Sequence, residues 1–234
     1  MNRAGRFSFL LMAVMGLSGW ASAAPLQRDW QQFYGPQGLQ FDVVRKGKTI
    51  GEYRGEFATA GDGFVFHSTM SIDLSILFMD FTYRYDARET WQPQAGDWQM
   101  QSLKVKVDDD GDAFALDLAS KNDALSGTRQ DKKKVTEVRF PNRLLTSQHY
   151  NPAILGQQQL INTLTGEINH FTLKNFGQEK ISSRDGSIKA THYQYQGDLH
   201  DTDVWYDAAG HWVGMAFKAS DGSQIRLVCR QCGQ

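Results

Sequence analysis

The chain has 234 residues, of which 25 are lysine or arginine and 26 are aspartate or glutamate, so its formal net charge at pH 7 is −1. This balance excludes the strongly basic surface that binds nucleic acid, and no nucleic-acid partner is expected. Aromatic residues make up 12% of the chain, which suits strand cores and cavities for apolar molecules. No segment beyond the N-terminus approaches ~20 apolar residues, so no transmembrane helix is predicted.

Residues 1–23 have the layout of a secretory signal peptide. Two arginines precede an apolar run over residues 7–20, and small residues follow it. The run is too short to span a bilayer, and cleavage after Ala23 would leave Ala24 as the new N-terminus. No cysteine follows the run, so no lipid anchor is expected. We therefore expect a periplasmic or secreted protein, in an oxidising compartment.

Residues 24–38 are expected to form an N-terminal extension and residues 39–234 a single β domain, because no Pro/Gly/Ser-rich linker divides them. Residues 39–57 predict two strands joined by a turn at Lys46-Gly47-Lys48. Residues 64–74 and 79–86 alternate apolar and polar side chains, which predicts a long hairpin connected near Ser75.

A further hairpin is predicted over residues 103–118, since Asp110-Gly111 favours a two-residue turn. Residues 119–134 are polar and end in the run DKKK, so we expect a solvated loop or hairpin tip there. Asn151 is a suitable N-cap and Pro152 suits a first helical turn, which predicts a short helix over residues 152–164. This helix would plug or cap an open end of the sheet.

Residues 191–229 predict four more strands, with turns at Gly197-Asp198, Ala209-Gly210 and Asp221-Gly222. Turn signals that recur about every ~10 residues favour an antiparallel meander over parallel βαβ units. The predicted fold is mainly β, a strongly curved sheet or open barrel of about a dozen strands with one short helix.

One internal echo carries the residues best able to do acid–base chemistry. YDARETW (85–91) and YDAAGHW (206–212) share Tyr-Asp-Ala and a tryptophan at the same offset. The echo marks either two related half-sheets or two strand ends entering turns. If its two copies met, they would gather the weak catalytic candidates Asp86, Glu89, Asp207 and His211. Turn and strand-end roles account for the same four residues.

No hydrolase, metalloprotease or phosphate-loop motif occurs after residue 23. The run VDDDGDAFALD resembles a calcium loop, but placing Gly111 at the sixth position puts Lys106 where a carboxylate is required. An acidic hairpin turn is therefore the favoured interpretation. We expect no metal and no cofactor.

Cys229 and Cys232 are the only cysteines and form a C-x-x-C pair. Only two residues follow, so no helix can stabilise a redox thiolate, and the six histidines show no pairing typical of a zinc site. A local disulfide is the preferred interpretation, with metal binding or redox function as the alternative. Because residues three apart on an extended strand cannot bridge, the chain would have to turn after Cys229.

Several motifs resemble one family of bacterial exported proteins. They are Glu89-x-Trp91, Asp110-Gly111, Asn151, Thr165-Gly166, Trp205-Tyr206-Asp207 and Asp221-Gly222. The family is catalogued as domain-of-unknown-function family 6134, and it is similar to family 3108. The likeness runs from about Leu39 to Val228, although the family usually has Trp where this chain has Tyr150. The resemblance implies an exported, mostly β protein with no established activity and no catalytic residues to carry over.

These patterns favour a periplasmic binding or accessory protein that holds a lipid or other apolar or amphipathic molecule on the concave face of the sheet. The candidate lining residues are Phe64, Phe66, Phe81, Tyr83, Trp91, Trp205 and Trp212. One alternative is an envelope enzyme that uses the Asp/Glu/His cluster. Another is an interaction module for an envelope protein, which would show a long unpaired strand edge or an apolar surface patch.

Overall fold

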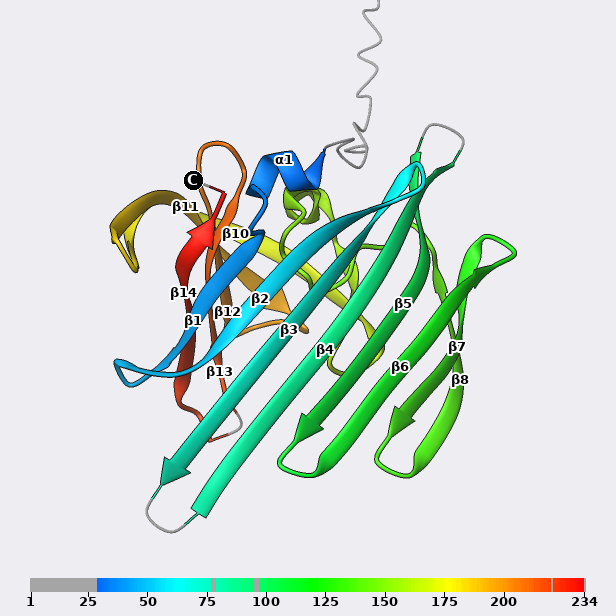
Figure 1. Ribbon diagram of the computed structural model, residues 1–234, viewed down its shortest axis with the longest axis horizontal. Coiled ribbons are helices and arrows are strands. Elements are labelled where there is room, and N and C mark those ends of the chain that lie inside the picture. Colours follow the sequence, from blue (N-terminus) through cyan, green and yellow to red (C-terminus); the bar gives the residue numbers. More distant parts are fainter. Residues whose placement is uncertain (1–28, 77–78, 95–96, 220, 234) are drawn as a thin grey trace, which may run out of the picture.

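The computed structural model describes residues 29–76, 79–94, 97–219 and 221–233 (Figure 1). The predicted signal peptide and its cleavage site lie outside these residues. The helical elements are α1 (Trp30–Tyr34) and the 3-10 turn η1 (Pro152–Gly156). The strands are β1 (Leu39–Arg45), β2 (Lys48–Ala60), β3 (Gly63–Ile76), β4 (Met79–Gln94), β5 (Asp97–Asp109), β6 (Asp112–Lys121), β7 (Ala124–Asp131), β8 (Lys134–Pro141), β9 (Gln159–Asn162), β10 (Glu167–Ser183), β11 (Gly186–Gly197), β12 (Thr202–Tyr206), β13 (Trp212–Lys218) and β14 (Gln224–Cys232).

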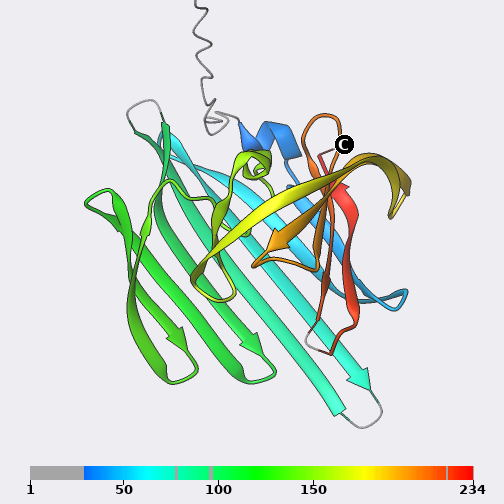
Figure 2. The ribbon, with the colours of Figure 1, turned by 180° about the vertical axis from the view of Figure 1, so that it is seen from behind.

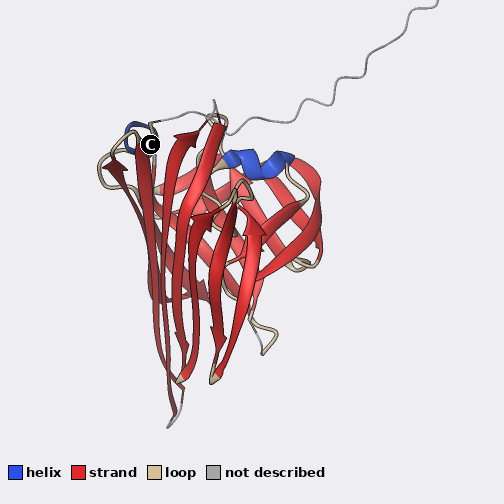
Figure 3. Cartoon of the chain, turned by 90° about the vertical axis from the view of Figure 1, so that its right-hand side faces the viewer, coloured by secondary structure: helices blue, strands red, loops and turns tan. Residues whose placement is uncertain are grey.

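All of these strands belong to one antiparallel sheet that is nearly closed into a barrel. Its order is β8-β7-β6-β5-β4-β3-β2-β1-β14-β13-β12-β11-β10-β9. All strands that are consecutive in the chain are neighbours in the sheet except β8 and β9, and the first and last strands, β1 and β14, pair with each other. Figures 2 and 3 show the strands curving around a common interior. The predicted antiparallel meander in an open barrel is confirmed, with β8 and β9 as the two ends of the sheet.

Alternation and turn chemistry place the strands as predicted. On β4, Tyr85, Ala87 and Glu89 are buried while the residues between them are exposed, which is the period of a strand with one wet face. Asp110 and Gly111 both have positive φ, 53° and 92°, as the two-residue turn between β5 and β6 requires.

The prediction of one helix over residues 152–164 is wrong in its extent and type. Only Pro152–Gly156 is helical, as a single 3-10 turn capped by the Asn151 side chain, and Gln159–Asn162 forms β9. The backbone of Ile161 makes hydrogen bonds of 2.9 Å with Leu145 O and with Ser147 N, and its strand pairs with β10. These long-range bonds replace the local bonds of a helix.

The polar segment 119–134 is also different from the prediction. It forms the end of β6 and all of β7, and only the DKKK run lies at a hairpin tip, where Lys132 and Lys133 make the turn. Leu125 faces the core from β7 while Thr128 and Gln130 are exposed, so the strand has one buried face despite its polar composition.

The residues just before β1 belong to the core. Asp29 caps α1 by accepting a hydrogen bond from Gln32 N, and the Trp30 and Tyr34 side chains are buried. The Tyr34 ring stacks on Phe57 of β2 at 5.5 Å between centroids. The packed domain therefore begins before Leu39, within the predicted N-terminal extension.

Cys229 and Cys232 form a disulfide with 6.0 Å between their Cα atoms. The predicted turn after Cys229 is absent, because β14 continues to Cys232. This strand carries a β-bulge, because Phe41 of β1 pairs with Cys229 while Gln40 pairs with Gln231, which leaves Arg230 as the extra residue. The bulge shortens the path between the two cysteines enough for the bridge.

Thiol titration of the purified native protein is expected to find no free cysteine, and two free thiols would contradict the oxidised state. The loop that the disulfide closes is short, so a Cys229→Ser/Cys232→Ser variant should lose only about 2 kcal/mol of unfolding free energy. Urea unfolding of both proteins measures this difference.

Candidate functional site

Residues 142–158, called the inner segment below, follow β8 and run inside the barrel (Figure 2). Asn142 enters by donating to the Gln99 Oε1 atom of β5 at 3.0 Å, while its carbonyl accepts from Met100 N at 2.9 Å. Tyr150 and Ile154, further along, are buried. The side chains of this segment therefore meet the inner faces of strands from different parts of the sheet.

Glu89 is the carboxyl group at the centre of these contacts. Its side chain projects inward from β4 and the residue is only 1% exposed. One oxygen accepts from the Trp91 indole at 2.9 Å and from the Tyr150 hydroxyl at 3.0 Å, and the other accepts from the Thr146 hydroxyl. Burial raises the pKa of Glu89 above its usual value, and the three hydrogen bonds oppose that rise.

Gln148 ties the inner segment to three more side chains. Its amide oxygen accepts from the Tyr53 hydroxyl at 3.0 Å, and its amide nitrogen donates to Ser68 at 2.6 Å and to Tyr85 at 2.8 Å. Tyr85 in turn donates to Thr163 at 2.9 Å. These buried polar groups thus satisfy one another.

His149 occupies an adjacent, largely aromatic position. Its Nδ1 atom lies 3.2 Å from the Tyr195 hydroxyl, and its ring lies 5.5 Å from the Trp212 ring. Burial lowers the pKa of His149 to about 4, so the imidazole is neutral at neutral pH. It supplies no positive charge to the interior.

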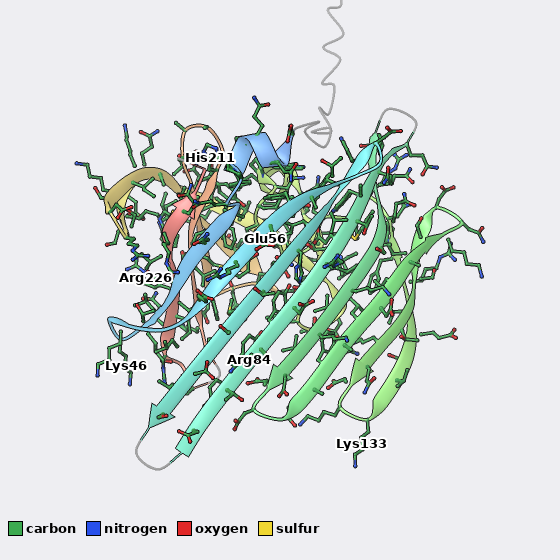
Figure 4. All side chains as sticks on the ribbon, in the orientation of Figure 1. Lys46, Glu56, Arg84, Lys133, His211 and Arg226 are labelled. Carbon is green, nitrogen blue, oxygen red and sulfur yellow. A yellow bond between two sulfur atoms is a disulfide. The ribbon has the colours of Figure 1, made fainter. Side chains whose placement is uncertain are left out.

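Asp207 and His211 form a pair near α1, where His211 is labelled in Figure 4. The carboxylate contacts His211 Nδ1 at 2.8 Å, and Nε2 lies 3.0 Å from Phe33 O. Burial pushes the pKa of Asp207 up, but the hydrogen bonds from His211 and the backbone hold it below its usual value. Both ring nitrogens are engaged, so the pair joins the β12–β13 turn to α1 and leaves no nitrogen free for a substrate.

The four catalytic candidates do not form one cluster. Asp86 lies on the outer face of β4, where its side chain is 55% exposed and contacts His67 at 2.9 Å, whereas Glu89 faces inward. Asp207 and His211 contact each other. The echoed segments are not equivalent either, since residues 85–91 lie within β4 and residues 206–212 span the turn from β12 to β13.

The aromatic lining candidates also occupy separate places. Phe66, Trp91 and Trp212 are buried in the core, and the Phe66 ring packs at a tilt against Tyr150 with 4.1 Å between centroids. Trp205 lies on the other face of β12, where it stacks on His192 at 4.7 Å and donates to Glu179 at 2.6 Å. The remaining three, Phe64, Phe81 and Tyr83, are partly buried.

An upper pocket of about 400 Å³ lies beside α1 and the β2–β3 turn. Phe64 lines it together with Trp30, Phe57 and Trp98. The Trp98 indole nitrogen is buried and has no hydrogen-bond partner among the described residues.

A lower pocket of about 260 Å³ lies on the concave face, between the β4–β7 wall and the β9–β10 turn. Tyr83, Val107 and Phe114 form its apolar wall, and Leu164 faces them from the turn while remaining 50% exposed. The charged lining residues are Asp109, Asp112, Arg129, Asp131 and Lys132. Burial and three neighbouring aspartates raise the pKa of Asp109.

The sequence patterns identified Glu89 but not its partners Thr146 and Tyr150. They also did not identify Gln148, which bonds to Tyr53, Ser68 and Tyr85. The signal that could have found them is the polar and aromatic run SQHYN at residues 147–151, which interrupts the alternating pattern without a turn dipeptide. Two of the motifs behind the family resemblance, Glu89-x-Trp91 and the Asn151 motif with Tyr150 before it, meet at the Glu89 carboxyl.

Neither a metal site nor a membrane helix is found in the part of the chain that the structure describes. No three His, Cys, Asp or Glu side chains gather there as metal ligands would. No helix in these residues has the length and apolar character needed to cross a bilayer.

The fold is similar to that of a beta-barrel-like protein of the domain of unknown function DUF1849 from Brucella abortus. Its crystal structure superposes with a TM-score of 0.56 at 10% sequence identity, covering 83% of this chain and 95% of that one. At this identity the likeness concerns the fold alone. No curated protein matches the chain. The profile of the family described as Domain of unknown function (DUF6134) matches residues 41–230, and the chain belongs to that family.

Proposed function

We propose that this chain is an exported binding protein that holds an amphipathic molecule in the lower pocket. The observation that carries the proposal is the composition of that pocket, an apolar wall of Tyr83, Val107 and Phe114 beside charged side chains. Concave sites with an apolar lining and a few polar groups are typical of small-molecule binding. Leu164 at the mouth stays half-exposed, and a bound apolar group would cover it.

Export is supported by the signal-peptide pattern of residues 1–23. The disulfide between Cys229 and Cys232 fits an oxidising compartment such as the periplasm. Two kinds of ligand are compatible with this location, a membrane lipid and a free amphiphile. Mass spectrometry of the molecules released when the purified protein is denatured distinguishes them. A stoichiometric amphiphile supports the proposal, and its absence from protein that also fails to bind an added probe contradicts it.

Leu164→Asp is expected to weaken binding of the fluorescent apolar probe N-phenyl-1-naphthylamine at least about tenfold, because a carboxylate would be placed against the apolar wall. Leu164 is half-exposed, so the substitution should leave the fold intact, which circular dichroism checks. Phe81→Asp, two residues from Tyr83 on the same face of β4, should also weaken binding. Fluorescence titration measures the dissociation constants.

Phe176→Asp is the matched control, because Phe176 is 49% exposed and lies outside the lower pocket. It should bind the probe as the unmodified protein does. Equal loss of binding in Leu164→Asp and Phe176→Asp, or no loss in either, would contradict the lower pocket as the site.

A further inference from the structure

The end strand β8 carries a row of backbone groups that no other described strand uses. In the sheet order β8 has β7 as its neighbour on one side and no described strand on the other. Figure 1 shows β8 at the margin of the sheet, and Figure 4 shows Lys133 projecting from the tip of the β7–β8 hairpin. An open edge of this kind is a template for another strand.

The pairing of β7 identifies which residues of β8 face that edge. Lys132 N donates to Ala113 O of β6 at 2.8 Å, so the even-numbered residues of β7 direct their backbone groups toward β6. The odd-numbered ones therefore face β8 and bond to its even-numbered residues, from Lys134 to Phe140. The N–H and C=O groups of Val135, Glu137 and Arg139 point away from β7.

The closure of the barrel leaves β8 uncovered. The β9–β10 turn docks on the inner face of β7, where Arg129 donates to Thr165 O and lies 3.6 Å from the Glu167 carboxylate. β8 lies one strand beyond this contact in the sheet order. Val135 on its outer face is 60% exposed, the largest exposure among the large apolar side chains that the structure describes.

The side chains of β8 complement a second copy of the same strand. In an antiparallel pair centred on Val138, Glu137 of each chain stands directly opposite Arg139 of the other, on the outer face. Both residues present their backbone groups to the edge, so each such pair can exchange two hydrogen bonds. Opposite charges that face each other across strands stabilise the pairing.

The neighbouring registers are unfavourable. A shift by one residue would pair each odd-numbered residue, whose backbone groups face the edge, with an even-numbered residue of the partner, whose backbone groups face β7 and cannot bond. A shift by two would set Glu137 against Glu137 or Arg139 against Arg139. Pro141 faces Val135 of the partner in the favoured register and has no N–H, so it ends the ladder. Charge and hydrogen bonding thus select one arrangement.

We propose that β8 is the interface of a symmetric homodimer, in which two copies of the chain join their sheets edge to edge through residues 135–141. The contact is narrow, so the association is weak and depends on concentration. It is independent of what the lower pocket binds.

Charge exchange tests this pairing by sedimentation velocity, from micromolar to near-millimolar protein. The unmodified protein should dimerise as its concentration rises. Glu137→Arg and Arg139→Glu should each weaken the dimer at least about tenfold, because each sets like charges opposite one another twice. An equimolar mixture of the two variants should recover the dimer, since every facing pair is then of opposite charge.

Glu56→Arg is the control, a charge reversal on the outer face of β2 inside the sheet (Figure 4), and it should dimerise as the unmodified protein does. Circular dichroism establishes that each variant is folded. A monomer at every concentration, dimers of the single variants as tight as the unmodified one, or a mixture that does not recover the dimer would each overturn the proposal.

Discussion

Replacing Glu89 by alanine is expected to remove about 3 kcal/mol or more of unfolding free energy, since it leaves three buried donors without an acceptor at roughly 1 kcal/mol or more each. Those donors are the Trp91 indole and the hydroxyl groups of Thr146 and Tyr150. A typical domain has only about 5–15 kcal/mol of stability, so the loss would be a large part of it. Urea unfolding followed by circular dichroism measures the change.

Glu89→Gln is the matched variant, and its expected cost is within about 1 kcal/mol. The amide keeps the shape of the carboxyl group, its oxygen can accept from Trp91 and Tyr150, and its NH₂ group can donate to Thr146 once that hydroxyl rotates. An alanine variant as stable as the unmodified protein would show that Glu89 does not anchor the inner segment. A glutamine variant as unstable as the alanine one would show that a charge, rather than these hydrogen bonds, is what the site requires.

As the pH falls from about 7.5 to about 4.5, the lowered pKa of His149 is expected to reduce the unfolding free energy of the protein by about 2.5 kcal/mol. Its pKa is about 4 in the folded chain and has an ordinary value of 6.5. As the pH falls through 6.5, the unfolded chain takes up a proton that the folded chain does not. Stability is therefore complete above pH 6.5 and is lost progressively toward pH 4.

His149→Asn is the comparison, because asparagine can keep a polar atom near the Tyr195 hydroxyl but does not titrate. Its unfolding free energy, measured with urea at both pH values, should lack this share of the pH dependence. Glu89 acts in the opposite direction, since its raised pKa makes its contribution fall as the pH rises from its usual value of 4.5. Because both proteins contain Glu89, its effect cancels in the difference. Identical pH dependence in the two proteins would mean that the pKa of His149 is not lowered in the folded chain, so that it takes up its proton as readily as in the unfolded chain.

The strands were predictable because their signals are local. Period-two alternation along β3 and β4 and the Asp110-Gly111 turn each depend on residues next to one another, and each predicted the right element. The same local reasoning failed for residues 159–162, where apolar spacing suited a helix. There the backbone bonds of Ile161 to residues 145 and 147 decided the structure, and no local pattern contains them.

The candidate site was less predictable because its partners are distant in the chain. Tyr150 and Glu89 are 61 residues apart, and Gln148 and Ser68 are 80 apart. The echo around Glu89 left open whether that residue meets Asp207 and His211, because four shared residue types do not determine which faces of a barrel meet. The bulge at Arg230, which lets Cys229 reach Cys232, likewise depends on pairing with β1 rather than on the local sequence.

The pairing of β1 with β14 has a consequence for the order of folding. Residues 39–45 can make their second set of strand bonds only when residues 225–232 lie beside them, so the sheet closes only when its most distant segments in the chain meet. Contacts of such long sequence separation carry a large loop-closure entropy and slow the search for the native topology. Until that contact forms, β1 has one free edge, and strands β1–β8 and β9–β14 are two separate sheets connected by residues 142–158.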